Sequence, residues 1–191
     1  SLRGLERLPR DRYEVASELV RPDALLVRSA DVHAIEIPAS VLAVARAGAG
    51  TNNIPVAKLS LRGIPVFNAP GANANAVKEL VIAGMLLGAR NLCQAWNFVE
   101  HLKEDGAALD KAVEGGKKTY VGFELPGRTL GVIGLGAIGV QVANAAVGLG
   151  MRVVGFDPQV TVERAWQLSA SVEQARSLDE LFSKADFLTV H

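Results

Sequence analysis

Short apolar runs alternate with longer helical stretches along most of this chain. The runs at residues 24–27, 41–45 and 64–67 are largely aliphatic and are bounded by Gly, Pro, Asn or Ser, which is typical of strands. Between the last two runs, residues 56–61 predict a short helix that ends at Gly63. Because strands and helices alternate, the sequence predicts an α/β fold with parallel sheets covered on both faces.

The middle of the chain, residues 77–102, has a helical pattern that fits one long helix or two in succession. An apolar stripe along one side predicts the packed face, with charged side chains such as Lys78 and Glu79 lying off it. The stripe consists of Leu80, Ala83, Leu87 and Ala89. The Asp-Gly pair at 105–106 and the Gly-Gly pair at 115–116 break the pattern and predict loops.

The last third of the chain repeats the alternation. Residues 125–127 (Leu-Pro-Gly) predict a turn into a strand that begins near Thr129. Farther on, Ser177 and Glu180 have the spacing of a capping box, in which the serine caps a helix and the glutamate reaches back to the serine amide. That helix leads into a final predicted strand at residues 187–190.

The strongest local signal is a glycine fingerprint at residues 134–139 (GLGAIG). It follows a predicted strand at 130–133 and opens a helix at 138–148, and a second strand at 152–156 completes a βαβ unit. This context favours a dinucleotide-binding loop over a glycine-rich turn without a ligand.

Each part of the fingerprint has a physical task. Gly134 permits the tight turn, Gly136 lets the backbone approach the pyrophosphate, and Gly139 allows close packing of the helix. The amides near Ala137 and Ile138 then face the phosphates at the positive end of the helix dipole. After the second strand, the carboxylate of Asp157 can accept hydrogen bonds from the adenosine ribose and would repel a 2′-phosphate, which favours NAD over NADP. Arg152 precedes that strand and is a poor phosphate clamp.

Composition narrows the possible partners. Twenty basic residues balance twenty acidic ones, so no excess charge points to nucleic acid or a membrane surface. Cys93 is the single cysteine and has no metal-ligand spacing around it, and no apolar run is long enough to span a bilayer. We therefore expect a cytoplasmic protein without a metal. Because the chain starts at Ser1 and stops directly after a predicted strand, we also expect it to be a fragment.

Several motifs in order resemble the D-isomer-specific 2-hydroxyacid dehydrogenases. The resemblance covers nearly the whole chain. One departure is Lys78, where many relatives have a small residue. Its segments are residues 26–29 (LVRS), 45–54 (ARAGAGTNNI), 63–70 (GIPVFNAP), Asn73, residues 77–80 (VKEL) and the glycine fingerprint.

This resemblance implies a substrate site in the first part of the chain. Gly48, Ala49 and Gly50 follow a strand and can offer backbone amides to a carboxylate, and in the family this loop also lies beside the nicotinamide. Arg28, at a strand end, can grip a carboxylate or phosphate, and Asn73 matches an asparagine near the interdomain cleft. On the residues alone, Arg28 and Arg46 could instead be surface salt-bridge partners. Asn73 could simply cap the following helix, and Gly48 and Gly50 could be plain turn glycines.

The family's catalytic histidine, glutamate and arginine should all lie beyond His191, so the chain itself is expected to be inactive. His191 matches a different family position, and His33 and His101 fit exposed surface positions.

We therefore expect two doubly wound parallel-sheet domains. Residues 1–73 form part of a flavodoxin-like substrate domain, and residues 74–191 form an incomplete Rossmann NAD-binding domain. The implied function is NAD-dependent oxidation of a D-2-hydroxy acid, with 3-phosphoglycerate, the entry to serine biosynthesis, as leading candidate. Two alternatives stay open: a dehydrogenase for glycerate or lactate, and a non-catalytic dinucleotide-binding sensor or corepressor-like protein. The family also implies a homodimer, with residues 92–102, including Trp96 and Phe98, as the contact surface.

Overall fold

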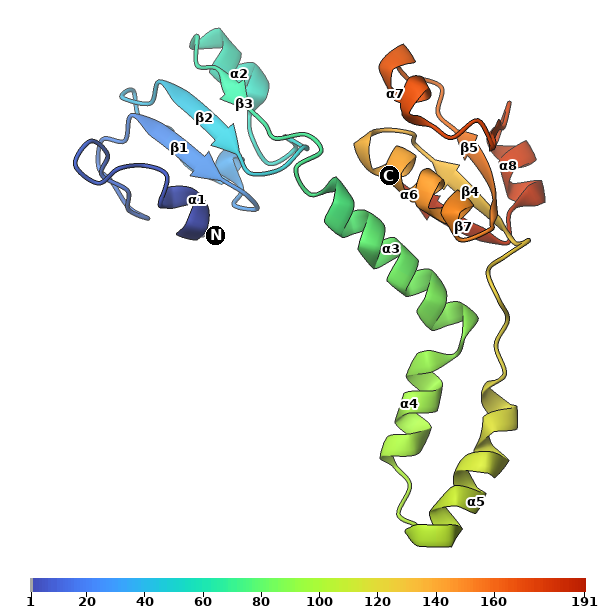
Figure 1. Ribbon diagram of the computed structural model, residues 1–191. Helices are drawn as coiled ribbons and strands as arrows, with labels where there is room; N and C mark the ends of the chain where they lie inside the picture. Colours follow the sequence, from blue (N-terminus) through green and yellow to red (C-terminus); the bar gives the residue numbers. More distant parts are fainter. Residues whose placement is uncertain (1) are drawn as a thin grey trace. The chain divides into compact units, whose positions relative to one another are not determined.

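The computed structural model describes residues 2–191 and divides into two compact units, Ser1–Pro70 and Gly71–His191 (Figure 1). Each unit contains its own parallel sheet and its own apolar core. The division falls three residues before the boundary expected from the sequence, so that Asn73 belongs to the second unit.

The first unit is built on a three-stranded parallel sheet with strand order β1-β2-β3. The strands are β1 (Ala24–Val27), β2 (Ala43–Arg46) and β3 (Val66–Phe67), and the helical elements are α1 (Leu2–Leu5), the 3-10 turn η1 (Val32–Ala34) and α2 (Val56–Leu61). Strands β2 and β3 begin two residues later than predicted. In β3 the reason is Pro65, which has no N–H to donate and only accepts a bond, from the Val44 amide at 3.0 Å. The core consists of Val32, Val41, Val44, Ile54, Leu59 and Ile64.

The second unit contains a four-stranded parallel sheet with strand order β6-β5-β4-β7. Its strands are β4 (Thr129–Ile133), β5 (Arg152–Phe156), β6 (Val172–Gln174) and β7 (Phe187–Val190). Helices α6 (Ala137–Gly148) and α3 (Ala74–Ala89) form one side of its core, whereas α8 (Leu178–Lys184) packs on the other side, and α7 (Val162–Gln167) precedes β6.

Neighbouring residues of β5 enter different cores, because side chains alternate along a strand: Val153 joins the α6 side and Val154 joins Leu181 of α8. This confirms the predicted α/β class with parallel sheets and, for this unit, helices on both faces of the sheet.

The helical segment in the middle of the chain is two helices, α3 and α4 (Leu92–Glu100). The break falls at Asn91, which adopts a left-handed conformation with φ of 50°. The predicted packed face of α3 is wrong except for the buried Ala89. Leu80 and Leu87 are 73% and 42% exposed, and Ala83 is also exposed. Because α3 is apolar on more than one side, its stripe does not identify the packed face; the face against α6 consists of Val81, Ile82, Met85 and Ala89, with Lys78 half-buried.

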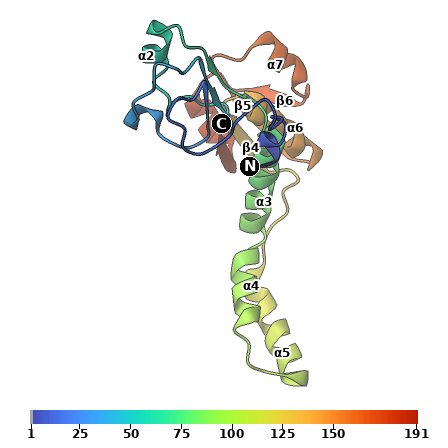
Figure 2. The ribbon, with the colours of Figure 1, turned by 90° about the vertical axis from the view of Figure 1, so that its left-hand side faces the viewer.

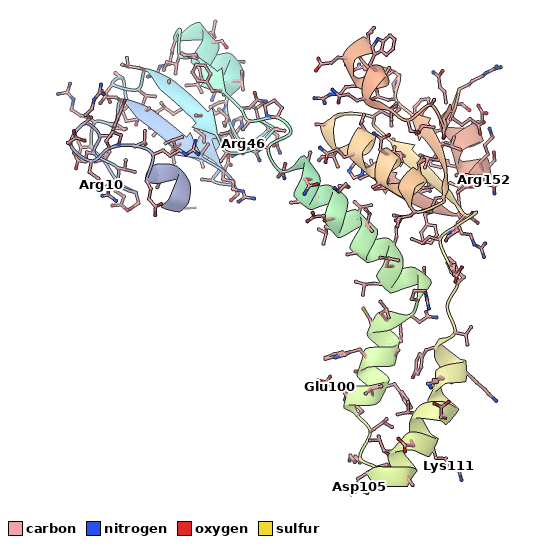
Figure 3. All side chains as sticks on the ribbon, in the orientation of Figure 1. Arg10, Arg46, Glu100, Asp105, Lys111 and Arg152 are labelled. Carbon is pink, nitrogen blue, oxygen red and sulfur yellow. The ribbon has the colours of Figure 1, made fainter. Side chains whose placement is uncertain are left out.

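The Gly-Gly pair at 115–116 lies inside helix α5 (Gly106–Lys117), which contradicts the predicted loop. The reason is packing: a Cβ on Gly116 would lie 2.4 Å from the ring of Phe98 in α4. That ring also packs against the tilted ring of Tyr120 in the 3-10 turn η2 (Lys118–Tyr120), with centroids 5.4 Å apart. Figure 2 shows α4 and α5 side by side, as a helical arm extending from the end of α3. Glu100, Asp105 and Lys111 mark its outer part in Figure 3.

Helix α8 begins at the predicted cap, but the second half of the capping box differs. The Ser177 hydroxyl accepts a hydrogen bond from the Glu180 amide at 3.1 Å, as expected. The Glu180 carboxylate accepts from the amide of Arg176 at 2.8 Å, one residue before the amide that the motif predicts. No helix among residues 2–191 is both long and apolar enough to cross a membrane.

Candidate functional site

The glycine loop connects the carboxyl end of β4 to helix α6. Gly134 has a φ of +86°, and a Cβ on it would lie 2.2 Å from the carbonyl oxygen of His191. A Cβ on Gly139 would lie 1.9 Å from the carbonyl oxygen of Gly134. Neither position has room for a side chain: Gly134 lets the loop pass close to the backbone of His191 after β7, and Gly139 lets the first turn of α6 lie directly against the loop.

Gly136 differs from these two glycines, because a Cβ built on it would meet nothing within 4 Å. It is the N-cap residue of α6, and no side chain caps the helix there. The first turn also contains no acidic residue. The amides at the helix start, including those of Ala137 and Ile138, therefore lack a side-chain acceptor and can bind an anion at the positive end of the helix dipole.

Asp157 directly follows β5 and contacts the loop. One oxygen of its carboxylate accepts a hydrogen bond from the Leu135 amide and the other accepts from the Gln159 amide, each at 2.8 Å. Each carboxylate oxygen has a further lone pair, so both bonds leave capacity for ribose hydroxyls.

Two contributors to this loop were not identified from the sequence. Leu135, only 7% exposed, packs beside Gly155, where a Cβ would lie 3.0 Å from a Leu135 methyl carbon. A glycine inside a strand often marks such a close approach, and this signal was present in the sequence of β5.

In the first unit, the predicted substrate residues Arg28 and Gly48–Gly50 follow the carboxyl ends of strands, whereas Asn73 belongs to the second unit. Arg28 follows β1. Arg46, labelled in Figure 3, is the last residue of β2. The Nε of Arg46 donates to the Arg28 carbonyl oxygen at 3.1 Å. The Arg46 guanidinium also lies against the loop at residues 48–50, since a Cβ on Gly48 would lie 2.7 Å from the Arg46 Nη1. Arg46 thus supports the strand ends and is not a surface salt-bridge partner.

Two asparagines, quoted above only within the motifs, fix these loops. The side-chain amide of Asn53 donates to the carbonyl oxygens of Arg28 and Ala30, at 3.2 and 2.7 Å. The side-chain amide of Asn68 donates to the carbonyl oxygen of Ala49 at 2.7 Å. The ends of β1, β2 and β3 are therefore connected by side-chain hydrogen bonds to backbone carbonyls.

Charge at this site is not compensated by the protein. Within the part of the chain that the structure describes, ion pairs involve Lys117, Arg128 and Lys184, and neither Arg28 nor Arg46 forms one. Two arginines at neighbouring strand ends, neither with a carboxylate partner, favour an anionic ligand.

The other candidates have ordinary surroundings. Asn73 occupies the N-cap position of α3 but makes no capping hydrogen bond with its side chain. His33 and His101 are exposed and contact backbone carbonyls. Partial burial lowers the pKa of His191, whose Nε2 lies 2.8 Å from the Thr189 hydroxyl. Among residues 2–191, no group of three or more His, Cys, Asp or Glu side chains could hold a metal ion.

A parallel β-α-β unit with this glycine loop, an uncapped helix start and an acid after the second strand defines a dinucleotide-binding domain of the Rossmann type. The family model of the D-isomer specific 2-hydroxyacid dehydrogenase NAD-binding domain matches residues 82–191. The chain belongs to this family, and its second unit is an NAD-binding domain.

Curated relatives agree with this assignment. The chain is 39% identical over 185 residues to D-3-phosphoglycerate dehydrogenase of Methanocaldococcus jannaschii, an alignment that covers 94% of this chain and 32% of that protein. It is 37% identical over 189 residues to hydroxypyruvate reductase of Thermotoga maritima, covering 97% of this chain and 56% of that protein. The chain thus spans about a third of the length of the phosphoglycerate dehydrogenase.

Solved structures show the same fold. NAD+-bound 3-phosphoglycerate dehydrogenase of Entamoeba histolytica aligns with a TM-score of 0.58 at 30% identity, covering 88% of this chain and 46% of that one. The holo form of Rhodotorula graminis D-mandelate dehydrogenase aligns with a TM-score of 0.66 at 28% identity, covering 81% of this chain and 44% of that one.

Proposed function

We propose that this chain supplies the NAD site and part of the substrate site of a dehydrogenase that oxidises 3-phosphoglycerate to 3-phosphohydroxypyruvate, the entry to serine biosynthesis. The observation that supports this substrate is the Arg46 guanidinium, which lies beside Gly48, bonds to the Arg28 carbonyl oxygen and forms no ion pair, with a second arginine, Arg28, at the neighbouring strand end. A substrate with both a carboxylate and a phosphate matches this charge. The single cysteine favours a reducing compartment, and we place the protein in the cytoplasm.

The cofactor site follows from the second unit. The amides at the start of α6 would bind the pyrophosphate, with Gly136 leaving room for it, and Asp157 would bind the adenosine ribose. Bound NAD would accept the hydride released from the hydroxyl-bearing carbon. In the first unit, Arg28 would hold the acidic groups of the substrate, and Ala49, fixed by Asn68, would lie beside the nicotinamide.

The cofactor assignment is tested by titrating the chain with NADH and NADPH while following tryptophan emission. Trp96 and Trp166, the two tryptophans of the chain, both lie in the second unit, so quenching reports on the unit with the glycine loop. We expect saturable quenching by NADH and much weaker quenching by NADPH. Absence of quenching by either nucleotide would contradict the proposed site.

The substrate assignment is tested by Arg28→Ala in the whole enzyme. We expect a loss of activity of about tenfold or more with 3-phosphoglycerate, because a charge-assisted contact is removed, and a smaller loss with lactate. Arg10→Ala is the matched control: Arg10 is an exposed arginine of the same unit, before β1 (Figure 3). Equal losses with both substrates would favour a small D-2-hydroxy acid, a reading supported by the similarity to D-mandelate and D-lactate dehydrogenases.

We also propose that the protein is a homodimer that pairs through the exposed apolar residues of helix α4. Helix α4 contains no buried residue, and its apolar Leu92, Trp96 and Val99 are 46%, 65% and 54% exposed. Phe98 does not belong to this surface, since its ring packs on Gly116 and Tyr120. Trp96→Lys should shift the sedimentation of the protein toward monomer, whereas the exposed α5 substitution Lys111→Glu should not. A wild-type protein that sediments as a monomer would contradict the dimer.

A further inference from the structure

The tip of the glycine loop is anchored to the end of β5. The Leu135 amide donates to the Asp157 carboxylate at 2.8 Å, and the Leu135 side chain is buried beside Gly155. On the preceding residue, the Gly134 amide donates to the Phe156 carbonyl oxygen at 2.9 Å. Residues 155–157, at the end of β5, therefore hold Gly134 and Leu135 of the loop in place.

These bonds divide the amides of the loop into two groups. The amides of Gly134 and Leu135 are directed to β5 and Asp157. The amides at the start of α6 have no side-chain cap and remain available for phosphate. The direction in which the α6 amides point therefore depends on how the bonds of Gly134 and Leu135 hold the loop.

We propose that Asp157 is a positioning residue for the glycine loop, in addition to the ribose contact expected of it. This inference rests on the proposed NAD site. Through the Leu135 amide, the carboxylate fixes the backbone that presents the α6 amides to the pyrophosphate. Loss of this carboxylate therefore weakens phosphate binding for NADH and NADPH alike. A carboxylate that acted only by repelling the 2′-phosphate would not have this effect.

Two substitutions separate the two roles of this carboxylate. Asp157→Ala removes both the negative charge and the acceptor for the Leu135 amide. Asp157→Asn removes the charge but retains one oxygen that can accept from the Leu135 amide, with the side-chain NH₂ turned toward the exposed Gln159 side. Asp110→Ala, which removes an exposed carboxylate on α5, is the control.

The experiment measures amide hydrogen exchange in the chain without nucleotide, together with its affinities for NADH and NADPH. In Asp157→Ala we expect the Leu135 amide to exchange about tenfold faster or more, since a bond to a charged acceptor is lost, while the Val132 and Val153 amides keep their protection. NADH should bind this variant about tenfold more weakly than it binds wild type, and NADPH should bind it no more tightly than it binds wild type. In Asp157→Asn, Leu135 protection and NADH affinity should stay within a few-fold of wild type, and NADPH should bind more tightly than to wild type.

Unchanged Leu135 exchange in Asp157→Ala would overturn the proposal. Tighter NADPH binding by that variant than by wild type would also overturn it, because this is the result expected if the carboxylate only repels the 2′-phosphate. If the alanine variant loses protection throughout the sheet, the asparagine variant decides: loss of Leu135 protection there overturns the proposal. Failure of wild type to bind NADH would refute the NAD site itself, while the exchange comparison would still test the anchor.

Discussion

Gly139→Ala tests whether the contact between helix α6 and the glycine loop is as close as the structure shows. The new Cβ would lie 1.9 Å from the Gly134 carbonyl oxygen, about 1.5 Å inside an ordinary contact of 3.4 Å. Both partners are backbone, so the helix or the loop must move by more than 1 Å. Overpacking of this kind costs about 1–3 kcal/mol, partly offset by a helix-propensity gain of about 1 kcal/mol. Because the backbone cannot rotate away, we expect a net loss of about 2 kcal/mol.

Gly148→Ala provides the matched control, because it makes the same change at the other end of α6. Gly148 is exposed, and a Cβ there would meet nothing within 4 Å, so this variant should gain up to about 1 kcal/mol. In urea unfolding followed by circular dichroism, the Gly139 variant should lower the midpoint by about 1 M, given a slope of about 2 kcal/mol/M. NADH affinity should also fall by about tenfold or more in Gly139→Ala and stay unchanged in Gly148→Ala. Equal midpoints and equal NADH affinities for the two variants would refute the close contact.

Three further changes test the remaining structure. Gly116→Ala should destabilise the helical arm by about 1–3 kcal/mol in urea unfolding, because its Cβ would meet an aromatic ring of α4 at 2.4 Å, whereas Gly115→Ala has free space and should not. Ser177→Ala removes the cap of α8 and should cost about 1 kcal/mol, measured as a lower urea midpoint. The Arg176 amide, and then Lys184, lower the pKa of Glu180 from 4.5, so the stability it contributes is present above about pH 4.5 and is lost as acid protonates it. Glu180→Gln should flatten this acid dependence of the urea midpoint, and an unchanged profile would contradict the assignment.

Local chemistry accounts for what the sequence could predict in the second unit. The tasks of Gly134 and Gly139 follow from a turn and a close approach within six residues, and the structure shows both. The cap at Ser177 is equally local and is confirmed. In each case the residues that decide the conformation are neighbours in the chain, so a single stretch of sequence contains the whole argument.

Where a partner comes from a distant part of the chain, the same reasoning failed. The packed face of α3 depends on α6, which begins 48 residues after α3 ends, and the apolar residues on several sides of α3 do not say which side that helix covers. The glycine pair at 115–116 looks like a loop because glycine weakens an isolated helix. Its actual reason is the ring of Phe98, which the sequence does not place beside Gly116.

Arg46 shows how the same limit applies to the candidate substrate site. An arginine after a strand has no local feature that separates a surface cation from a structural support, and the sequence left both readings open. The bond from its Nε to the Arg28 carbonyl oxygen crosses two adjacent parallel strands, and the contact with Gly48 requires the loop to fold back over the guanidinium. Both depend on β1 and β2 being neighbours, a property of the sheet and not of either segment. The motif around Arg46 thus indicated the region of the candidate anion site, and only the strand order explains how its side chain is held there.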